Sequence, residues 1–93
     1  MNLQELINSK DVNIVDVRTS LEFEGGNVIG SVNIPLDQVV ERIEDLRSMQ
    51  PLVLCCASGG RSGQACDYLE AQGFTEVYNG GGWIAVNAQK NNV

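Results

Sequence analysis

The sequence predicts an α/β domain built on a small parallel sheet of four or five strands, with helices on both faces. Short β-branched and apolar segments alternate along the chain with segments in which apolar residues recur at helical spacing. The most apolar short segment, residues 52–55, stands between Pro51 and a glycine-rich stretch, as expected of a strand buried on both faces. The chain of 93 residues can bury one core but is too short for a second. We therefore expect one domain over residues 1–93.

The first half of the chain is expected to form a short helix, two strands and a longer helix. Leu3, Leu6 and Ile7 have the spacing of one helix face, and the β-branched residues within 13–18 predict the first strand. A second strand over residues 31–35 ends at its proline. An apolar stripe then predicts one helix, and the acidic residues between its members are expected to face solvent. The stripe is Leu36, Val39, Val40, Ile43 and Leu46, and the acidic residues are Asp37, Glu41, Glu44 and Asp45.

Charged residues at the end of the first predicted strand are expected to have structural roles. Asp16 lies where the strand reaches its carboxyl end, and a buried carboxylate there must bind loop N–H groups or pair with a nearby arginine. Arg18 and Glu22 are four residues apart, a spacing that predicts a local ion pair across the following turn.

The second half is expected to add a strand, a helix, another strand and a final segment. The helix begins near Ser62 and closes at Gly73, a residue suited to the left-handed position after a helix. A further strand is predicted over 74–78, and the glycines 80–82 are expected to turn the chain into a last segment around Trp83. Residues 90–93 are expected to fray. The buried side of the helix is predicted to be Ala65, Cys66, Tyr68 and Leu69.

The stretch after residue 55 has the composition of an anion-binding loop around a thiol. Cys56 would lie at the carboxyl end of a parallel strand, where ligands bind in open α/β sheets. The small residues Ala57, Ser58, Gly59 and Gly60 let backbone N–H groups turn toward a ligand. The charge of Arg61 and the N-terminus of a helix near Ser62 add positive potential at the same place. A thiol held there should ionise below its free pKa of roughly 8.5, which makes Cys56 a candidate nucleophile.

The other two cysteines are given different roles. Side chains alternate along a strand, so Cys55 should point away from the loop if Cys56 points into it. Cys66 is expected to be an inert small residue of a helix, with a resolving thiol as the alternative. Three cysteines, two of them adjacent, do not suggest a disulfide framework, and without histidine or a Cys-x-x-Cys pair they do not suggest a zinc site.

Five segments in a fixed order resemble the single-domain rhodanese family. They are Asp16-Val17-Arg18, Glu22-Phe23, the run from Gly26 to Pro35, Cys56-Ala57-Ser58-Gly59-Gly60-Arg61-Ser62, and Gly73-Phe74 with the Gly80-Gly81-Gly82 run. The resemblance covers nearly the whole chain and implies a rhodanese-like fold. Two positions depart from the usual pattern: Asn27 replaces a histidine, which we interpret as a structural position, and Cys55 replaces a large apolar or aromatic residue.

The resemblance implies a sulfurtransferase that carries sulfane sulfur as a persulfide on Cys56. Thiosulfate or a persulfide would be the donor, and a thiol, cyanide or a sulfur-carrier protein would be the acceptor. Residues Ala57, Ser58, Gly59, Gly60, Arg61 and Ser62 would bind the substrate, and neither a metal nor an organic cofactor is implied.

Two alternatives remain open from the sequence. Counted from Cys55, the pattern Cys-x5-Arg-Ser resembles the phosphate loop of tyrosine phosphatases and arsenate reductases, although the glycine spacing fits the shorter loop that begins at Cys56. A phosphatase would also need an aspartic acid to protonate the leaving oxygen, and no loop segment clearly supplies it. The second alternative is a rhodanese-like binding module or persulfide carrier without catalytic turnover.

Composition bounds the partners and the compartment. A net charge of −6 argues against nucleic acid, because binding to phosphates rests on clustered Lys and Arg. No stretch approaches the roughly 20 apolar residues that span a bilayer, so no membrane association is expected. The N-terminus has no basic start followed by a long apolar segment, and a cytoplasmic protein is therefore expected.

Overall fold

A four-stranded sheet in the order β2-β1-β3-β4 organises the computed structural model, which describes residues 1–90. All three strand pairings are parallel. The strands are β1 (Asn13–Asp16), β2 (Val32–Asn33), β3 (Leu52–Cys56) and β4 (Val77–Gly82). The predicted α/β class, with four parallel strands, is confirmed.

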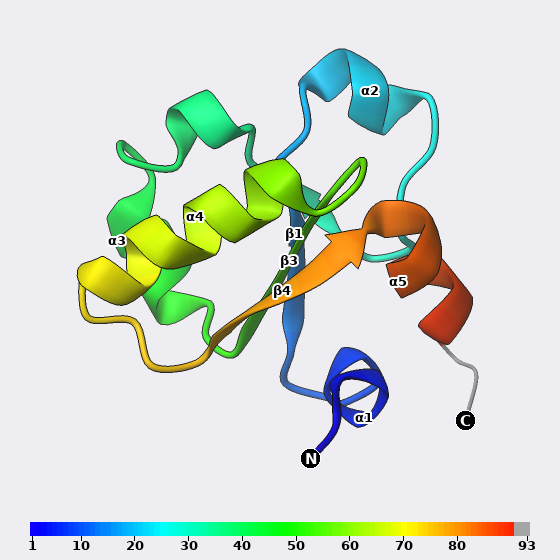
Figure 1. Cartoon of the computed structure of the whole chain (residues 1–93), viewed down its shortest axis with the longest axis horizontal. Helices are drawn as coiled ribbons and strands as arrows, with labels where there is room; N and C mark the ends of the chain where they lie inside the picture. Colours follow the sequence, from blue (N-terminus) through cyan, green and yellow to red (C-terminus); the bar gives the residue numbers. More distant parts are fainter. Residues whose placement is uncertain (91–93) are drawn as a thin grey trace.

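Helices cover both faces of the sheet (Figure 1). The 3₁₀ helix η1 (Leu36–Gln38), α3 (Ile43–Ser48) and α4 (Gly60–Ala71) lie on one face, and α1 (Leu3–Ile7) and α5 (Trp83–Gln89) lie on the other. The central strand β3 is buried along its whole length. Its side chains therefore alternate between two core clusters, with Leu52, Leu54 and Cys56 in the larger and Val53 and Cys55 in the smaller.

The apolar stripe of residues 36–46 does not form one helix, as the spacing had predicted. The chain makes the single turn of η1, passes through turns, and becomes helical again in α3. Val39 and Leu46 are buried, whereas Val40 is 61% exposed. Adjacent β-branched valines lower helix propensity, and the break lets the buried members of the stripe reach the core without a continuous helix.

The last strand also lies later in the chain than predicted. The expected strand over 74–78 is replaced by β4, which continues through the glycines to Gly82. A bulge at Gly80 shifts the register, since Leu54 is opposite Asn79 while Cys55 is opposite Gly81. A Cβ on Gly80 would lie 2.8 Å from a Val53 methyl group and 2.9 Å from one of Val86, so only glycine fits against β3 and α5 at this position. The glycines thus bring β4 alongside Cys56 rather than ending the sheet.

A helix that the sequence reasoning did not include, α2 (Ser20–Glu24), follows β1. The predicted ion pair between the side chains of Arg18 and Glu22 is wrong. Arg18 instead pairs with Asp16 at 2.7 Å and donates to the main-chain oxygen of Glu22 at 3.3 Å. Both roles stated for Asp16 are confirmed, because its carboxylate pairs with the Arg18 side chain and also accepts from the main-chain N–H of Arg18 at 3.0 Å. The buried charges of Asp16 and Arg18 already neutralise each other, so the Glu22 carboxylate does not pair with the Arg18 side chain.

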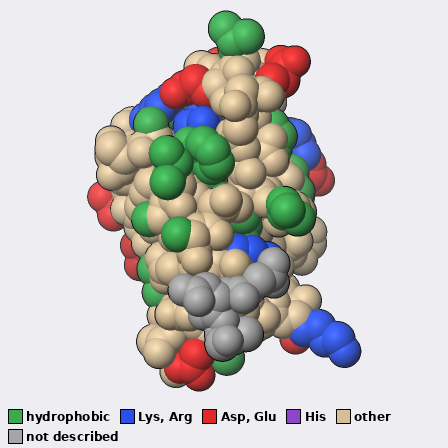
Figure 2. All heavy atoms as spheres, turned by 90° about the vertical axis from the view of Figure 1, so that its right-hand side faces the viewer, with side chains coloured by type: hydrophobic (Ala, Val, Ile, Leu, Met, Phe, Trp, Pro, Cys, Tyr) green, Lys and Arg blue, Asp and Glu red, His purple; other side chains and the backbone are tan. Residues whose placement is uncertain are grey.

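Figure 2 shows the face that carries α5, where hydrophobic side chains form several separate groups. The most exposed large apolar residues of the described chain after Met1 are Leu21, Ile29 and Ile84. Among residues 1–90, no helix is long and apolar enough to cross a membrane. The predicted fraying of residues 90–93 falls largely on 91–93, outside the described residues, whereas the Lys90 ammonium donates to the main-chain oxygen of Ile7 at 3.1 Å.

Candidate active site

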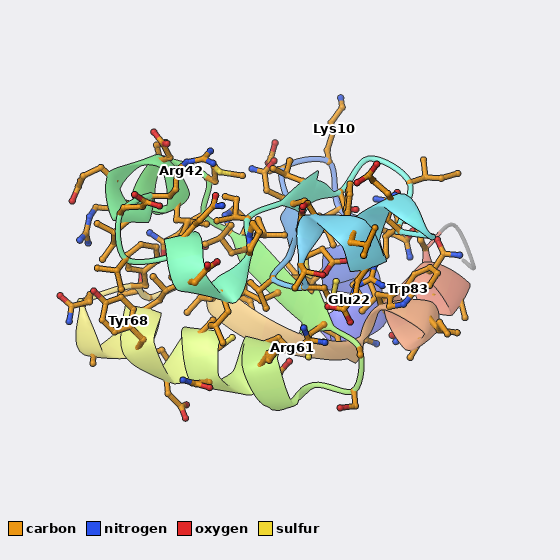
Figure 3. All side chains as sticks on the ribbon, turned by 90° about the horizontal axis from the view of Figure 1, so that it is seen from above. Lys10, Glu22, Arg42, Arg61, Tyr68 and Trp83 are labelled. Atoms are coloured by element: carbon orange, nitrogen blue, oxygen red, sulfur yellow. The ribbon has the colours of Figure 1, made fainter. Side chains whose placement is uncertain are left out.

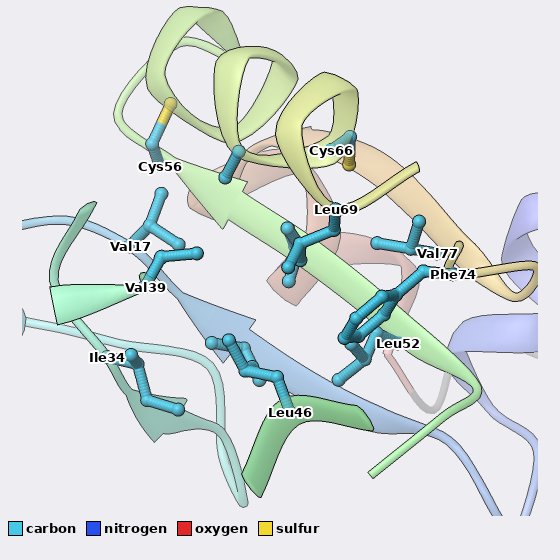
Figure 4. Packing of buried hydrophobic residues seen from close by; sticks show 13 residues of the cluster. Val17, Ile34, Val39, Leu46, Leu52, Cys56, Cys66, Leu69, Phe74 and Val77 are labelled. Carbon is cyan, nitrogen blue, oxygen red and sulfur yellow. The ribbon is translucent and has the colours of Figure 1, made fainter. Parts of the chain in front are cut away.

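The end of β3 and the start of α4 wrap a loop around the sulfur of Cys56. The side chain of Cys56 points toward this loop in Figure 4. The N–H of Gly59 donates to Sγ at 3.0 Å, and the hydroxyl of Ser62 donates to it at 3.4 Å. Gly59 is the N-cap of α4 and has a φ of 103°. This left-handed backbone conformation is one that a residue with a Cβ rarely adopts. The predicted cradle of backbone N–H groups therefore forms around the predicted thiol.

This arrangement favours the thiolate of Cys56. Burial alone would raise the pKa, but hydrogen bonds from the Ser62 side chain and from the N–H groups of Ser62, Gly59 and Ser58 lower it to about 7. Cys56 itself is only 1% exposed. A reactant can therefore reach this sulfur only by passing between the residues of the loop.

The other two thiols lie in a different environment. Cys55 is fully buried on the opposite face of the sheet, and burial together with the charge of Asp16 raises its pKa to about 12. Cys66 packs in the same cluster as Cys56 from the middle of α4, and burial raises its pKa to about 12 as well. Cys55 and Cys56 therefore point to opposite faces of β3, as the alternation of side chains along a strand predicted. Only Cys56 combines a loop of donors with a low pKa.

The residues predicted to bind substrate all lie around this loop. Arg61 and Ser62 are in the first turn of α4, where Arg61 is partly exposed and Ser62 is fully buried. Gly59 is half-buried. The exposed members of the set are Ala57, Ser58 and Gly60.

Asn79 of β4 fastens the loop to the sheet, and the sequence reasoning did not single it out. Its Oδ1 accepts from the Ser62 hydroxyl at 2.7 Å and from the Gly81 N–H at 2.9 Å. Its Nδ2 donates to the main-chain oxygen of Gly59 at 3.1 Å. The Ser62 hydroxyl has one hydrogen and two acceptors, Asn79 Oδ1 and Cys56 Sγ. Asn79 is therefore placed to influence how strongly Ser62 stabilises the thiolate.

We expect Asn79→Asp to make Cys56 less reactive near neutral pH. A carboxylate would draw the Ser62 hydrogen away from Sγ and add a negative charge near the thiolate, and both effects raise the pKa of Cys56. In the unchanged protein, alkylation by neutral iodoacetamide should increase as the pH rises through about 7. In the variant the alkylation rate below pH 7 should fall on the order of tenfold. Each unit by which the pKa of Cys56 rises lowers the thiolate fraction at a fixed pH below that pKa by about this factor.

The control is Asn87→Asp, which adds the same charge at an exposed position of α5. It should leave the pH profile unchanged. A profile for Asn79→Asp that matches the control would show that Ser62 does not couple Asn79 to the thiolate.

Arg61 pairs with a glutamate from another helix. Its Nη1 and Nη2 donate to Oε1 and Oε2 of Glu22 at 2.7 Å and 3.0 Å (Figure 3). Glu22 comes from the first turn of α2, where Thr19 and Glu22 form a capping box. The spacing Thr19-x-x-Glu22 is a sequence signal for such a box and would have predicted this helix start. The spacing of residues along the sequence does not indicate that the Glu22 carboxylate pairs with Arg61 rather than with Arg18.

Asn27, one of the two positions that depart from the rhodanese pattern, makes a structural contact. Asn27 donates from Nδ2 to the main-chain oxygen of Phe23 at 2.9 Å, so it closes the end of α2. This agrees with the structural interpretation of that position. The neighbouring loop is held by Arg18, which donates to the main-chain oxygen of Gly26 at 2.6 Å and lies 4.8 Å from the centre of the Trp83 ring.

Comparison with known proteins places this chain in a family. The chain matches the rhodanese-like domain over residues 2–89. A sulfurtransferase of Allochromatium vinosum is 37% identical over 83 residues, which cover 88% of this chain and 78% of the relative. Thiosulfate sulfurtransferase GlpE of Shewanella oneidensis is 33% identical over 90 residues, which cover 92% and 89%. The match to YqhL of Bacillus subtilis, 44% identical over 66 residues, covers 71% of this chain and spans about half of that relative, 52% of its length.

Solved structures show the same fold. A structure described as a rhodanese with anions from E. coli has a TM-score of 0.72 and 34% identity, covering 80% of this chain and 89% of that one. A rhodanese-related protein from Thermoplasma volcanium has a TM-score of 0.76 and 27% identity, covering 91% and 84%. The family match over most of the chain agrees with the parallel α/β fold described above. The chain belongs to the rhodanese-like domain family.

Proposed function

We propose that the protein is a sulfurtransferase that moves sulfane sulfur through a persulfide on Cys56. The observation that carries this proposal is the convergence of several hydrogen-bond donors on one sulfur atom, with a pKa lowered to about 7. This pKa leaves a larger share of the Cys56 thiol ionised at neutral pH than the few per cent of a free thiol. The names of the sulfurtransferase relatives support the same reaction class.

In the first half-reaction, the Cys56 thiolate attacks the outer sulfur of thiosulfate. A new S–S bond forms, the S–S bond of thiosulfate breaks, and sulfite leaves with the bonding electron pair. The persulfide on Cys56 then holds the transferred sulfur inside the loop. The N–H groups of residues 58, 59 and 62 are positioned to stabilise its negative charge, and no proton needs to move.

In the second half-reaction, a thiophilic acceptor attacks the outer sulfur of the persulfide. With cyanide, a C–S bond forms, the persulfide S–S bond breaks, and the Cys56 thiolate is restored as thiocyanate leaves. A thiol or a sulfur-carrier protein would accept sulfur in the same way. Arg61 would bind an anionic donor with its planar fork, and the small residues Ala57 and Gly60 keep the mouth of the loop clear.

The environment of Cys55 gives no support to the phosphatase alternative. That reading needs Cys55 as the nucleophile, but Cys55 is fully buried in the smaller core cluster and its pKa is raised to about 12. A nucleophile must be ionised and must reach its substrate. Cys56 meets the first requirement, and it lies directly beside exposed residues of the loop, whereas Cys55 faces the core on the opposite side of the sheet.

The proposal predicts a burst of sulfite when thiosulfate is mixed with the protein without an acceptor. Because the first half-reaction ends at the persulfide, sulfite should be released in an amount equal to the protein and then stop. Adding cyanide should restart sulfite release and produce thiocyanate at the same rate. Continuous sulfite release without any acceptor, or none at all with cyanide present, would contradict the two-step scheme.

A further inference from the structure

The fork of Arg61, which would bind an anionic donor, is already occupied. Both terminal nitrogens of Arg61 donate to the two carboxylate oxygens of Glu22, as Figure 3 shows for the labelled side chains. A bidentate contact of this kind uses the same planar edge that recognises other oxyanions. An incoming anion therefore competes with Glu22 for Arg61.

Glu22 is held in place independently of Arg61. Its Oε1 accepts from the N–H and from the hydroxyl of Thr19, each at 3.1 Å. Its main-chain oxygen accepts from the buried Arg18 at 3.3 Å. The first turn of α2 thus presents the carboxylate at a fixed place, and the longer side chain of Arg61 reaches toward it from α4.

The charges around Arg61 reinforce this competition. A cleft of about 460 Å³ borders Arg61 and Thr19, and the other charged residue in its lining is the exposed Asp37 of η1. With Arg61 paired to Glu22, Asp37 is left as the unbalanced charge of the cleft. Hydrogen bonds from Arg61 and then from Thr19 lower the pKa of Glu22 to about 2, so the carboxylate stays charged at any pH where the protein would work.

We infer that Glu22 is a specificity-determining residue that weakens binding of dianionic sulfur donors by competing for Arg61. This inference rests on the proposed function. The pair is partly exposed, at 36% and 38% for the two side chains, so an anion can displace Glu22 rather than being excluded. The site then favours donors with less negative charge next to their transferable sulfur than thiosulfate has, such as the persulfide of a larger thiol.

The test replaces Glu22 by an amide and probes Cys56 with two alkylating reagents of different charge. Glu22→Gln keeps an oxygen for the Thr19 donors but removes the charge that holds Arg61. Iodoacetate is an anion and iodoacetamide is neutral, so the ratio of their rates reports anion recognition at the site, whatever the thiolate fraction. The rates are measured well above the pKa of Cys56, and peptide mapping confirms that Cys56 is the residue modified.

The ratio of iodoacetate to iodoacetamide rates should rise about two- to fivefold in Glu22→Gln, the range expected from loss of a partly exposed ion pair. The matched control is Glu24→Gln, which removes one charge from the same helix at an exposed position and should leave the ratio unchanged. With Arg61→Ala as the background, Glu22→Gln should have no effect, because the coupling acts through Arg61. The KM for thiosulfate should fall by a similar factor in Glu22→Gln, with kcat unchanged.

A ratio in Glu22→Gln equal to that of the control would show that the ion pair only holds α2 to α4. A ratio that falls would show that Glu22 orients Arg61 for the anion, and either result overturns the inference. The alkylation measurement does not depend on sulfur transfer. A protein that never releases sulfite but shows the increased ratio would therefore disprove the two-step reaction with thiosulfate and leave the competition between Glu22 and anions for Arg61 standing.

Discussion

Cys56→Ser protein treated with thiosulfate should gain no sulfur, whereas the unchanged protein should gain one sulfur atom on the peptide that carries Cys56. The loop donors converge on this Sγ alone, and a serine hydroxyl at the same place is not ionised near neutral pH. Turnover of thiosulfate with cyanide should fall to the uncatalysed background. Mass spectrometry of the intact protein and of its peptides measures the added sulfur.

Cys66→Ala is the matched control for this prediction. Cys66 is buried within α4 and its pKa is raised to about 12, so its removal should leave sulfur loading unchanged. Sulfur that is still added to the Cys56→Ser protein would show that another residue of the chain takes up the sulfur. If Cys66 were the resolving thiol stated as the alternative, it would attack the Cys56 persulfide, release sulfide and form a Cys56–Cys66 disulfide, so Cys66→Ala would keep its added sulfur longer than the unchanged protein.

Arg61→Ala should lower kcat/KM for thiosulfate by about tenfold or more, since a hydrogen bond to a charged group contributes on the order of 1.5–3 kcal/mol. The thermal unfolding midpoint should change little, because exposed ion pairs such as Arg61 with Glu22 contribute little to stability. Arg61→Lys should restore only part of the activity, since a point charge cannot form the bidentate contact. Steady-state kinetics with thiosulfate as the varied substrate measures the effect.

A second measurement separates recognition of the donor from support of the loop. Arg61→Ala should shift the pH profile of Cys56 alkylation by iodoacetamide only slightly, because the largest effects that lower the pKa of Cys56 are hydrogen bonds from Ser62, Gly59 and Ser58. If Arg61 instead braces the loop, the variant should lose thermal stability and the low pKa of Cys56 together. Kinetics equal to those of the unchanged protein would show that Arg61 does not bind the donor.

Local chemistry made the Cys56 loop predictable from the sequence. A short apolar run, small residues and an arginine stand in consecutive order, so the strand, the loop and the start of the helix are set within one stretch of chain. The same holds for the alternation of Cys55 and Cys56, because side chains in any strand point to opposite faces. The α/β class followed from the alternation of apolar segments, whose period does not depend on distant residues.

The limits of the apolar segments were less predictable. The stripe of residues 36–46 has helical spacing, yet packing against the sheet breaks it into η1 and α3. The glycines 80–82 looked like a turn, but the absence of a side chain on Gly80 is what lets β4 pass close to β3 and α5. In both cases the contact that decided the structure lies in another part of the chain.

The sequence by itself determined the fold class and the place of the candidate nucleophile Cys56 in its loop, because both depend on the order of neighbouring residues. Tertiary structure alone decided which charges meet. Glu22 lies four residues from Arg18 but pairs with Arg61, 39 residues away, because Asp16 already neutralises Arg18 inside the core. Asn79 reaches Ser62 because α4, which carries Ser62, packs against β4. Long-range charge pairs and hydrogen bonds depend on which partners the packed strands and helices leave within reach, and a spacing rule does not contain that information.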